Sequence, residues 1–456
     1  MLKLIKRSTS YIVRLLTEII SIATSKERLW QLLHTRLYSN ALYLMTANVV
    51  NAILGFVFWI IVARFYSTED IGFASAVIAA VGLVIAFSHL GMGVSLVRFL
   101  SHSSNNANSM INTALTIGIL TSSTAALIFV TGLHFWSQSL LFIRQNPLYL
   151  AAFVLIAIIA NVSYLTDQAF VAGRRAGFVT ARYLIFSILK LALPIPLAAF
   201  FKSFGIFASW GVSLGIALLF SVFLFLPRVH PGYQPFPTIS KKVVNDIMRF
   251  SSAAYLYRLL WGMPAWILPI VVLNLLGAES NAYFYIAWTI ASAAGMIPSA
   301  VSTSLFAEGS HDEVKLGLNM WRSLKMTNLI LVPAVILILA IADKLLLLFG
   351  GTFTENATIL LRVLVIATLP LTINVIFLST KMVQKELKVV IGLAAYIVVA
   401  SLGLTYLLLP QMGITGAGIA WLFTHGTAAI VVVAISLKRR RAVKHIAADI
   451  SRAKGD

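Results

Sequence analysis

The chain contains no cysteine, and only 11% of its 456 residues are charged. The absence of cysteine excludes disulfide bonds, thiolate ligands for a metal and a thiol nucleophile. Soluble proteins carry about a quarter charged residues, so the shortage of charge, together with 59% hydrophobic residues, excludes a soluble globular protein. Long uncharged runs recur instead, and a run of about 18 or more apolar residues is typical of a membrane-spanning helix. The protein is therefore expected to be embedded in a membrane.

Signals for a metal or a cofactor are also missing. The 8 histidines are scattered, and no two of them have a ligand spacing such as H-x₃-H. The glycine-rich stretch GITGAG at 413–418 lacks the lysine of a phosphate-binding loop and the preceding strand of a dinucleotide fold. We therefore expect neither a metal nor a cofactor.

Twelve apolar runs are long enough to span the membrane, so the sequence predicts an all-α polytopic membrane protein. The longest connection, at 229–250, contains prolines that suit an extended linker. No connection is long enough for a folded catalytic domain, so we expect a transporter rather than an enzyme. The predicted spans lie near 41–63, 73–97, 110–133, 148–166, 183–201, 205–227, 251–273, 283–306, 326–346, 358–380, 389–409 and 413–437.

Six spans precede the linker and six follow it, which predicts an N-lobe at 41–228 and a C-lobe at 251–437. The stretches FYSTEDIGFASAV (65–77) and LLGAESNAYFYIA (275–287) lie 210 residues apart, and each contains a short acidic turn before a small residue and an aromatic one. An even number of spans in each half makes the halves parallel repeats. Transporters with this layout hold their site between the halves, near the middle of the membrane.

Basic segments lie at both ends of the chain. In residues 1–40, apolar side chains recur at helical spacing while most of the lysines and arginines lie off that stripe. The pattern fits an amphipathic helix on an anionic membrane surface, and a loosely ordered basic tail explains it equally well. Residues 438–456 form a second basic tail.

The net charge of +20 is distributed unevenly across the predicted membrane. Of the 35 lysines and arginines, 28 fall on the side that both termini share, 4 on the opposite side, and Lys190, Arg258 and Arg362 inside spans. Cytoplasmic loops carry such an excess of positive charge. We therefore expect a multi-pass protein of the plasma (inner) membrane with both termini in the cytoplasm. The positive charge reflects topology, so binding of nucleic acid is not expected.

Four stretches resemble a known family: ARFYSTEDIGFASA (63–76), TDQAFVAGRRAGFVTAR (166–182), LGAESNAYFYIAWTIASA (276–293) and LLLPQMGITGAGIAW (407–421). They resemble the polysaccharide transporter (Wzx-type oligosaccharide flippase) family of the multidrug/oligosaccharidyl-lipid/polysaccharide exporter superfamily. The resemblance implies two helical lobes around a central cavity. It also implies a polyprenyl-pyrophosphate-linked oligosaccharide as substrate, moved to the outer leaflet for cell-surface polysaccharide synthesis. Membrane lipids and other glycan-assembly proteins are the partners expected of such a protein.

Two cations inside the predicted spans are candidates for binding an anionic headgroup. Arg258 and Lys190 lie about 10 and 12 Å along their helices from the cytoplasmic end. A cation at such depth costs about 2.5–3.5 kcal/mol unless it faces a polar cavity or snorkels to the interface. Tyr255 and Trp261 accompany Arg258, and aromatic rings suit both sugar faces and an interfacial belt.

The repeat adds two asparagines to this candidate site. Residue 48, which lies 210 positions before Arg258, is Asn48, and Asn51 lies one helical turn further on. Amides hydrogen-bond to hydroxyl groups, and a guanidinium pairs with phosphate oxygens. Alternatively, the asparagines join helices to one another. The predicted cavity residues are Arg258, Asn48, Asn51, Lys190, Tyr255 and Trp261.

A second group of residues is predicted at the cytoplasmic entrance: Asp167, Arg174, Arg175 and Arg98. Asp167 is expected to pair with Arg174 or Arg175, or the two arginines meet lipid phosphates. Helix kinks are predicted at Gly262, Pro264, Pro269 and Pro298, either as moving parts of alternating access or as static bends.

Two other functions remain open from the sequence. A cation-coupled small-molecule exporter of the same superfamily needs a buried carboxylate in the first lobe, and Asp167 is the acidic candidate there. A membrane glycosyltransferase or ligase would use an acidic outer loop such as Glu69-Asp70, but the chain has no D-x-D pair and short outer loops. The scarcity of buried carboxylates disfavours carboxylate-based proton antiport and leaves Na⁺, H⁺ or the membrane potential as the driving force.

We predict that Arg258→Ala inserts into the membrane normally and loses translocation of a lipid-linked glycan, because the anionic headgroup loses a cation. The measurement is glycan flipping in cells that depend on this chain. Undiminished transport by the variant would refute the role of Arg258.

Overall fold

The computed structural model describes residues 36–100, 107–198, 201–241, 243–244, 252–311 and 316–453. This part of the chain is helical and contains no strand. Twelve of its helices are long and apolar enough to cross a membrane, which confirms the predicted all-α polytopic fold. The predicted surface helix falls within residues 1–40, of which 1–35 lie outside the described part.

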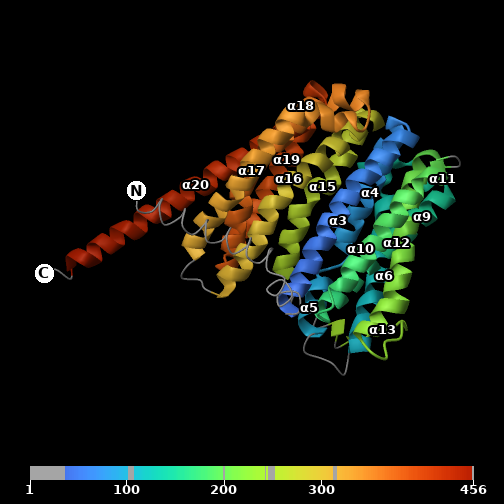
Figure 1. Cartoon of the computed structure of the whole chain (residues 1–456), viewed down its shortest axis with the longest axis horizontal. Coiled ribbons are helices and arrows are strands. Elements are labelled where there is room, and N and C mark those ends of the chain that lie inside the picture. Colours follow the sequence, from blue (N-terminus) through green and yellow to red (C-terminus); the bar gives the residue numbers. More distant parts are fainter. Residues whose placement is uncertain are drawn as a thin grey trace, which may run out of the picture.

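The helices form two lobes, which separate at the linker (Figure 1). The N-lobe contains α3 (Arg36–Phe65), α4 (Thr68–Ser88), α5 (Met92–Leu100), α6 (Ala107–Thr131), α7 (Leu133–Trp136), η2 (Gln138–Leu140), α8 (Phe142–Gln145), α9 (Pro147–Ala172), α10 (Gly177–Ala192), α11 (Pro194–Ala198), α12 (Lys202–Phe220), the π-helical turn η3 (Ser221–Phe225) and α13 (Leu226–Val229). The C-lobe contains α15 (Ser252–Leu276), α16 (Ala278–His311), α17 (Leu316–Leu347), α18 (Gly351–Val383), α19 (Leu387–Met412) and α20 (Ile414–Ala453).

Local sequence signals set the helix ends. A membrane interior offers no water to unpaired backbone groups, so spans are helical and break only near their ends. Ser67 and Asp70 form a reciprocal cap at the start of α4: the Asp70 amide donates to the Ser67 hydroxyl, and the Ser67 amide donates to the Asp70 carboxylate. Between α15 and α16, Gly277 adopts a φ of +85°, a conformation that favours glycine. The acidic turn at residues 67–70 is therefore a helix cap.

The two lobes repeat one helical framework. Contacts between α3 and α10, α4 and α6, α6 and α9, and α9 and α12 recur between α15 and α19, α16 and α17, α17 and α18, and α18 and α20. The helices α4 and α16 begin 210 residues apart, at Thr68 and Ala278. The helices α9 and α18 end 211 residues apart, at Ala172 and Val383.

Two unusual backbone features recur at the same spacing. Arg174 and Lys385 follow α9 and α18 with φ values of 53° and 57°, rare for residues other than glycine. In each turn the amide of the next residue donates to the carbonyl five residues before it. Near the start of α12 and of α20, a Cβ on Gly205 or Gly416 would lie 2.9 or 2.7 Å from the carbonyl oxygen of a leucine eight residues earlier. These pairs fix the correspondence between the lobes at 211 residues from α9 onward.

Contacts between the lobes gather at one end of the bundle. We call it the outer end, because the charge distribution predicts that the opposite, inner end faces the cytoplasm. The Asn281 amide donates to the Gly72 carbonyl at 2.7 Å. The Asn274 amide donates to the Trp136 carbonyl at 3.1 Å and its oxygen accepts from the Ser137 hydroxyl at 3.0 Å. Hydrogen bonds between polar side chains and backbone join α15 and α16 to the N-lobe there.

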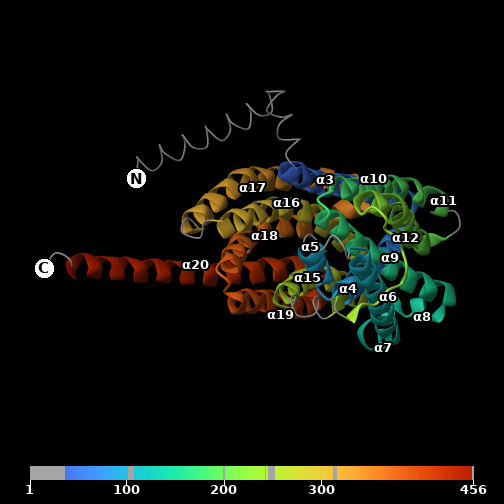
Figure 2. The ribbon, with the colours of Figure 1, turned by 90° about the horizontal axis from the view of Figure 1, so that it is seen from below.

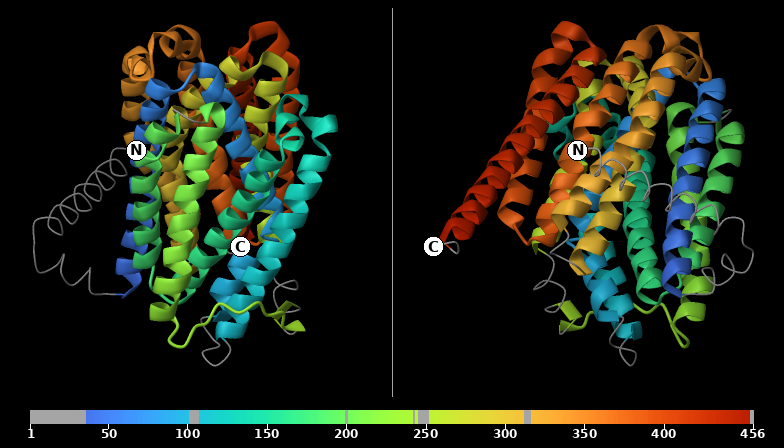
Figure 3. Two further views of the ribbon diagram at one scale, coloured as in Figure 1. Left: turned by 90° about the vertical axis from the view of Figure 1, so that its right-hand side faces the viewer. Right: turned by 60° about the vertical axis from the view of Figure 1, so that its left-hand side comes forward.

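The lobes are further apart at the inner end. In the right-hand view of Figure 3, α3 (blue) approaches the yellow and orange helices α16 and α17 toward the outer end and diverges from them toward the inner end. The edge contact of Trp59 with Tyr285, whose ring centroids are 5.0 Å apart, joins α3 to α16. On the other side of the interface, the Tyr255 hydroxyl donates to the Ala86 carbonyl at 3.0 Å and joins α15 to the end of α4.

The predicted linker and tail differ in conformation. Residues 231–240 of the linker are non-helical, and the Asn108 and Asn112 amides of α6 donate to carbonyls of this segment at 2.8 and 2.7 Å. The membrane-spanning part of α20 ends at Leu437, but the helix continues to Ala453 and projects beyond the bundle (Figure 2).

We predict that Gly72→Val opens the outer end, because a Cβ at residue 72 would overlap the backbone of Ala278 in the other lobe. The natural chain has no cysteine, so Ile78→Cys, in the N-lobe wall, reports access specifically. Adding Gly72→Val should make this thiol react with a membrane-impermeant reagent supplied from outside. Gly295→Val is the matched control, since nothing lies within 4 Å of a Cβ there. Unchanged reactivity would show that this contact does not keep the outer end closed.

Candidate functional site

A cavity of about 330 Å³ lies in the N-lobe beside the lobe interface. Its walls come from α3, α4, α9, α10 and α12, and Tyr285 of α16 completes them from the C-lobe. Its polar lining comprises Asn51, Ser163, Tyr164, Asp167, Arg182, Tyr183 and Lys190, and its large aromatic side chains are Phe58, Trp59, Phe186, Trp210 and Tyr285. The site therefore combines charged groups with aromatic faces.

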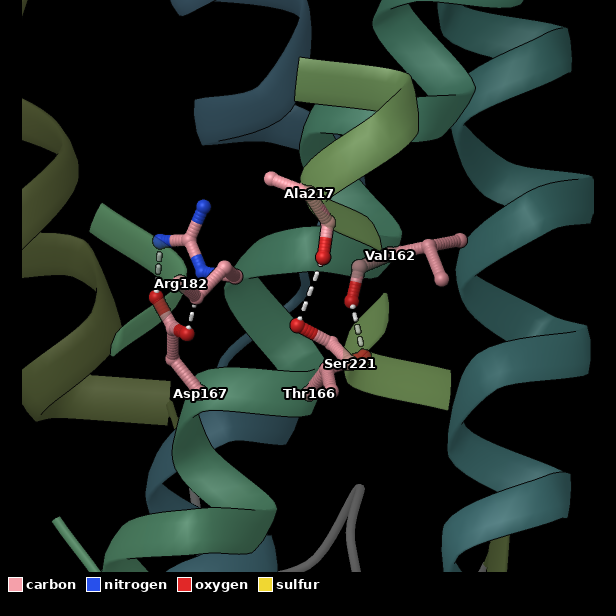
Figure 4. Close-up of polar contacts among 6 residues, drawn as sticks. All are labelled: Val162, Thr166, Asp167, Arg182, Ala217 and Ser221. Carbon is pink, nitrogen blue, oxygen red and sulfur yellow. Dashed lines mark hydrogen bonds and ion pairs between the residues drawn. The ribbon is translucent and has the colours of Figure 1, made fainter. Parts of the chain in front are cut away.

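A buried ion pair forms one wall of the cavity (Figure 4). Arg182 donates from Nε to Oδ1 of Asp167 at 2.6 Å and from Nη2 to Oδ2 at 2.5 Å. The Arg182 and Asp167 side chains are only 4% and 10% exposed. Two parallel charge-assisted hydrogen bonds make this a geometrically fixed pair. The guanidinium also lies 4.4 Å from the ring centroid of Tyr183.

The helical hairpin explains why Asp167 pairs with Arg182 rather than with Arg174 or Arg175, as the sequence suggested. Asp167 lies five residues before the end of α9, and Arg182 lies five residues after the start of α10. Because the two helices run in opposite directions from one turn, these positions reach the same depth. Arg174 and Arg175 belong to the turn itself and are exposed. The correct partner depends on the hairpin geometry rather than on proximity in sequence.

Lys190 supplies a second cation on the same helix face. Arg182, Phe186 and Lys190 follow one another at four-residue spacing on α10, so they share one side of it. Lys190 is 5% exposed and forms no ion pair with any described residue. Its ammonium lies 5.1 and 4.7 Å from the ring centroids of Phe58 and Phe186. The ammonium therefore does not snorkel to the surface, and aromatic faces are its described neighbours.

The structure distributes the six predicted cavity residues over several places. Asn51 and Lys190 line the cavity, together with Asp167 from the predicted entrance, whereas Asn48 is exposed one turn away on α3. Arg258 is exposed on α15, next to the hydroxyl of Tyr164.

Tyr255 and Trp261 have other neighbours. The Tyr255 hydroxyl is bonded to the backbone of α4, and the ring of Trp261 lies 6.3 Å from that of His425 in the C-lobe. His89 contacts Tyr255 at the inner end, and burial, with a smaller contribution from Arg258, lowers the pKa of His89 to about 4. His89 is therefore neutral at physiological pH.

The remaining predicted positions lie away from the cavity. Arg98, Arg174 and Arg175 are exposed near the inner end. Gly262, Pro264 and Pro269 lie inside α15, and Pro298 inside α16; both helices continue through these residues. A non-helical φ/ψ pair interrupts α17 instead, at Ile341.

Sequence reasoning missed Arg182, Tyr183, Trp210 and Tyr285 as cavity residues. The four-residue spacing of Arg182, Phe186 and Lys190 was the signal that could have found Arg182, since it places two cations on one helix face. The aromatic residues gave no such signal because aromatics occur throughout the chain. Among the described residues, no group of three or more histidine and acidic side chains is placed to hold a metal.

A family model described as polysaccharide biosynthesis protein matches residues 37–307. The chain belongs to this family. The match covers the whole N-lobe and the first two helices of the C-lobe, including every residue that lines the cavity. A search of curated proteins finds no match to the sequence.

Solved structures share the fold of this polysaccharide biosynthesis protein. An inward-facing multidrug resistance transporter of the MATE family and MOP superfamily has a TM-score of 0.67 at 16% identity, with 87% of this chain and 96% of that one covered. An outward-facing multidrug resistance transporter of the same family has a TM-score of 0.60 at 17% identity, covering 91% and 98%. A MOP superfamily transporter from Pyrococcus furiosus has a TM-score of 0.63 at 16% identity, covering 91% and 98%. The fold is that of a two-lobed membrane exporter.

We predict that Arg182→Leu lowers the free energy of unfolding by about 3–5 kcal/mol, because it leaves the buried Asp167 carboxylate without its partner. The double variant Asp167→Leu/Arg182→Leu should recover most of this loss, because a buried ion pair is replaced by apolar side chains. The C-lobe carries leucine at both corresponding positions, Leu378 and Leu393. Thermal unfolding in detergent measures both effects. A double variant as unstable as the single one would contradict this account.

Proposed function

We propose that the protein moves a polyprenyl-pyrophosphate-linked oligosaccharide from the cytoplasmic to the outer leaflet by alternating access. The observation that carries this proposal is the buried ammonium of Lys190, which has no counter-ion among the described residues of the cavity. The proposed setting is the plasma membrane, with both termini in the cytoplasm.

The charge balance of the cavity supports an anionic substrate. Asp167 neutralises Arg182, so the ammonium of Lys190 sets the net charge of the wall. Placing a cation inside a membrane protein costs about 2.5–3.5 kcal/mol, and a bound phosphate would offset that cost through a charge-assisted hydrogen bond. Arg258, beside Tyr164, adds positive charge next to the cavity. A cationic drug would meet repulsion from the same groups.

The remaining lining supports a sugar next to the phosphate. Trp59, Trp210 and Tyr285 offer aromatic faces, while Asn51 and Ser163 offer hydrogen-bonding groups. Small-molecule sites span about 300–1,000 Å³, so a cavity of about 330 Å³ suits a pyrophosphate and the first sugar rather than a whole oligosaccharide. The rest of the glycan would lie between the lobes.

The arrangement of the lobes suits loading from the cytoplasmic side. The inter-lobe hydrogen bonds of Asn281 and Asn274 lie at the outer end, and α3 diverges from α16 toward the inner end (Figure 3). An anion that leaves the cytoplasm moves with the membrane potential, which supplies about 2.3 kcal/mol per charge at 100 mV. The potential is thus sufficient in sign to drive export, and an ion such as Na⁺ or H⁺ would add to it.

A second candidate is a cation-coupled small-molecule exporter, and the buried carboxylate of Asp167 in the first lobe favours it. The bidentate pair with Arg182 weakens this candidate, because the carboxylate is already neutralised. A Pyrococcus furiosus protein of this fold is described as having a binding pocket of reverse polarity that suggests a different function. Pocket polarity is therefore the property on which we separate the two candidates. A glycosyltransferase built on Glu69-Asp70 is disfavoured, since Asp70 caps α4.

We predict that Lys190→Met, which keeps the length of the side chain and removes its charge, lowers glycan translocation at least about tenfold, equivalent to about 1.4 kcal/mol of lost interaction. Lys190→Arg is the matched control and should retain most of the activity. Flipping of lipid-linked oligosaccharide in membrane vesicles is the measurement. Full transport by Lys190→Met, or a phenotype confined to drug resistance, would favour the small-molecule exporter.

A further inference from the structure

The repeat places a second group of residues in the C-lobe at the positions that line the N-lobe cavity. The correspondence is 210 residues for α3 and α4 and 211 residues from α9 onward, as the helix ends and the recurring turns fix it. The corresponding pairs are Asn51 and Trp261, Ile78 and Trp288, Ser163 and Asn374, Trp210 and Trp421, and Leu214 and His425.

These five C-lobe residues also lie together. The ring of His425 lies 4.3 Å from that of Trp421 and 6.3 Å from that of Trp261, and Trp288 lies 4.9 Å from Trp421. The Asn374 amide contacts His425. Four helices, α15, α16, α18 and α20, therefore bring their side chains to one place, as their counterparts do in the N-lobe. We call this group the C-lobe aromatic box.

The box has no charge of its own. Where the N-lobe cavity carries Asp167, Arg182 and Lys190, the C-lobe carries Leu378, Leu393 and Ser401. Three indoles and a neutral hydrogen-bonding pair, His425 and Asn374, take their place. The two halves of one duplicated site thus differ in chemistry: one is charged and the other is aromatic and neutral.

The hydrogen bonds of Asn374 determine the tautomer of His425. The Asn374 Nδ2 atom lies 3.0 Å from the backbone carbonyl oxygen of His425 and 3.2 Å from its Nδ1 atom. The carbonyl only accepts, so the amide group must present its N–H groups to both atoms. Nδ1 is then an acceptor, and the proton of the neutral imidazole is on Nε2.

Two polar atoms of this pair are left without partners. Both residues are 0% exposed, and neither Nε2 of His425 nor Oδ1 of Asn374 has a hydrogen-bond partner among the described residues. A buried group left unpaired costs about 1–3 kcal/mol, so each such group in a folded protein requires an explanation. Here one is a donor and the other is an acceptor.

We propose that the C-lobe aromatic box is a second substrate subsite, which binds uncharged sugar rings of the glycan while the N-lobe cavity holds the pyrophosphate. This inference rests on the proposed function. Sugars present apolar C–H faces that pack on indoles, and each hydroxyl both donates and accepts, which satisfies a donor and an acceptor together. A phosphate has no cation to meet there, because the charged positions of the N-lobe are leucines and a serine.

The box is closed in this conformation and opens through movement of α15. His425 is fully buried, while Trp261 and Trp421 are only half-buried. Trp261 belongs to α15, which also contacts α4 of the other lobe. A change in the relative position of the lobes therefore carries Trp261 with respect to α20 and exposes the Nε2–H group. Gly262 and Pro264, which follow Trp261 directly, are the points where α15 bends most readily.

The test exchanges residues between the repeats. His425→Leu and Asn374→Ser each install the residue that the N-lobe carries at the corresponding position, Leu214 and Ser163. The purified full chain is titrated with two ligands, polyprenyl pyrophosphate without sugar and the polyprenyl-pyrophosphate-linked oligosaccharide pool extracted from host membranes. Stabilisation against thermal unfolding reports each affinity. Lys190→Met serves as the comparison variant for the charged half of the site.

We expect the wild-type chain to bind the glycan-bearing lipid about tenfold more tightly than the bare lipid, since a site with buried hydrogen-bonding groups discriminates strongly for hydroxyls. Both exchange variants should keep their affinity for the bare lipid and lose this difference, whereas Lys190→Met should bind both lipids weakly. Equal affinity of the wild-type chain for the two lipids, or an undiminished difference in both exchange variants, overturns the sugar subsite and leaves the proposed function standing.

Two further outcomes are distinct. A wild-type chain stabilised by neither lipid refutes the proposed function and the subsite together. Exchange variants that keep the glycan preference but lose a pH dependence of transport would identify His425 as a proton site, which also overturns the sugar subsite. Asn374→Ser keeps the test decisive if His425→Leu fails to fold.

Discussion

The bidentate ion pair of Asp167 with Arg182 is the interaction on which the candidate site depends. It fixes α9 against α10 at a defined register, and it cancels two of the three charges in the cavity wall. Lys190, two turns further along α10, then determines the sign of the remaining charge. Because a membrane interior penalises every unpaired charge, one pair decides whether this cavity suits an anion or a cation.

The duplicated framework explains how one fold holds two different kinds of lining. Equivalent helix pairs, the turns at Arg174 and Lys385, and the close approaches at Gly205 and Gly416 recur in both lobes, because they are set by backbone geometry. The side chains that face the two equivalent sites carry no such constraint. The N-lobe therefore places charges where the C-lobe places leucines, and indoles where the N-lobe has an asparagine and an isoleucine.

Sequence reasoning located most of the framework and little of the site. Twelve apolar runs and the six-plus-six count predicted the helices and the lobes correctly, because the bilayer requires continuous apolar helices whatever their packing. The pairing of Asp167 with a neighbouring arginine was wrong, since Arg174 and Arg175 belong to the turn and Arg182 lies at the matching depth. Arg258 was the most conspicuous charge in sequence, yet it lies beside the cavity lining rather than within it.

By itself the sequence determined the solvent of this protein: hydropathy and charge are sums along the chain, so they specify membrane spans and the predicted direction of insertion without reference to contacts. Only the tertiary structure decided which charges cancel, that Lys190 has no described counter-ion, and that His425 meets Asn374 and three indoles. These relations join residues on different helices, and their positions follow from how the helices cross, which no local pattern encodes.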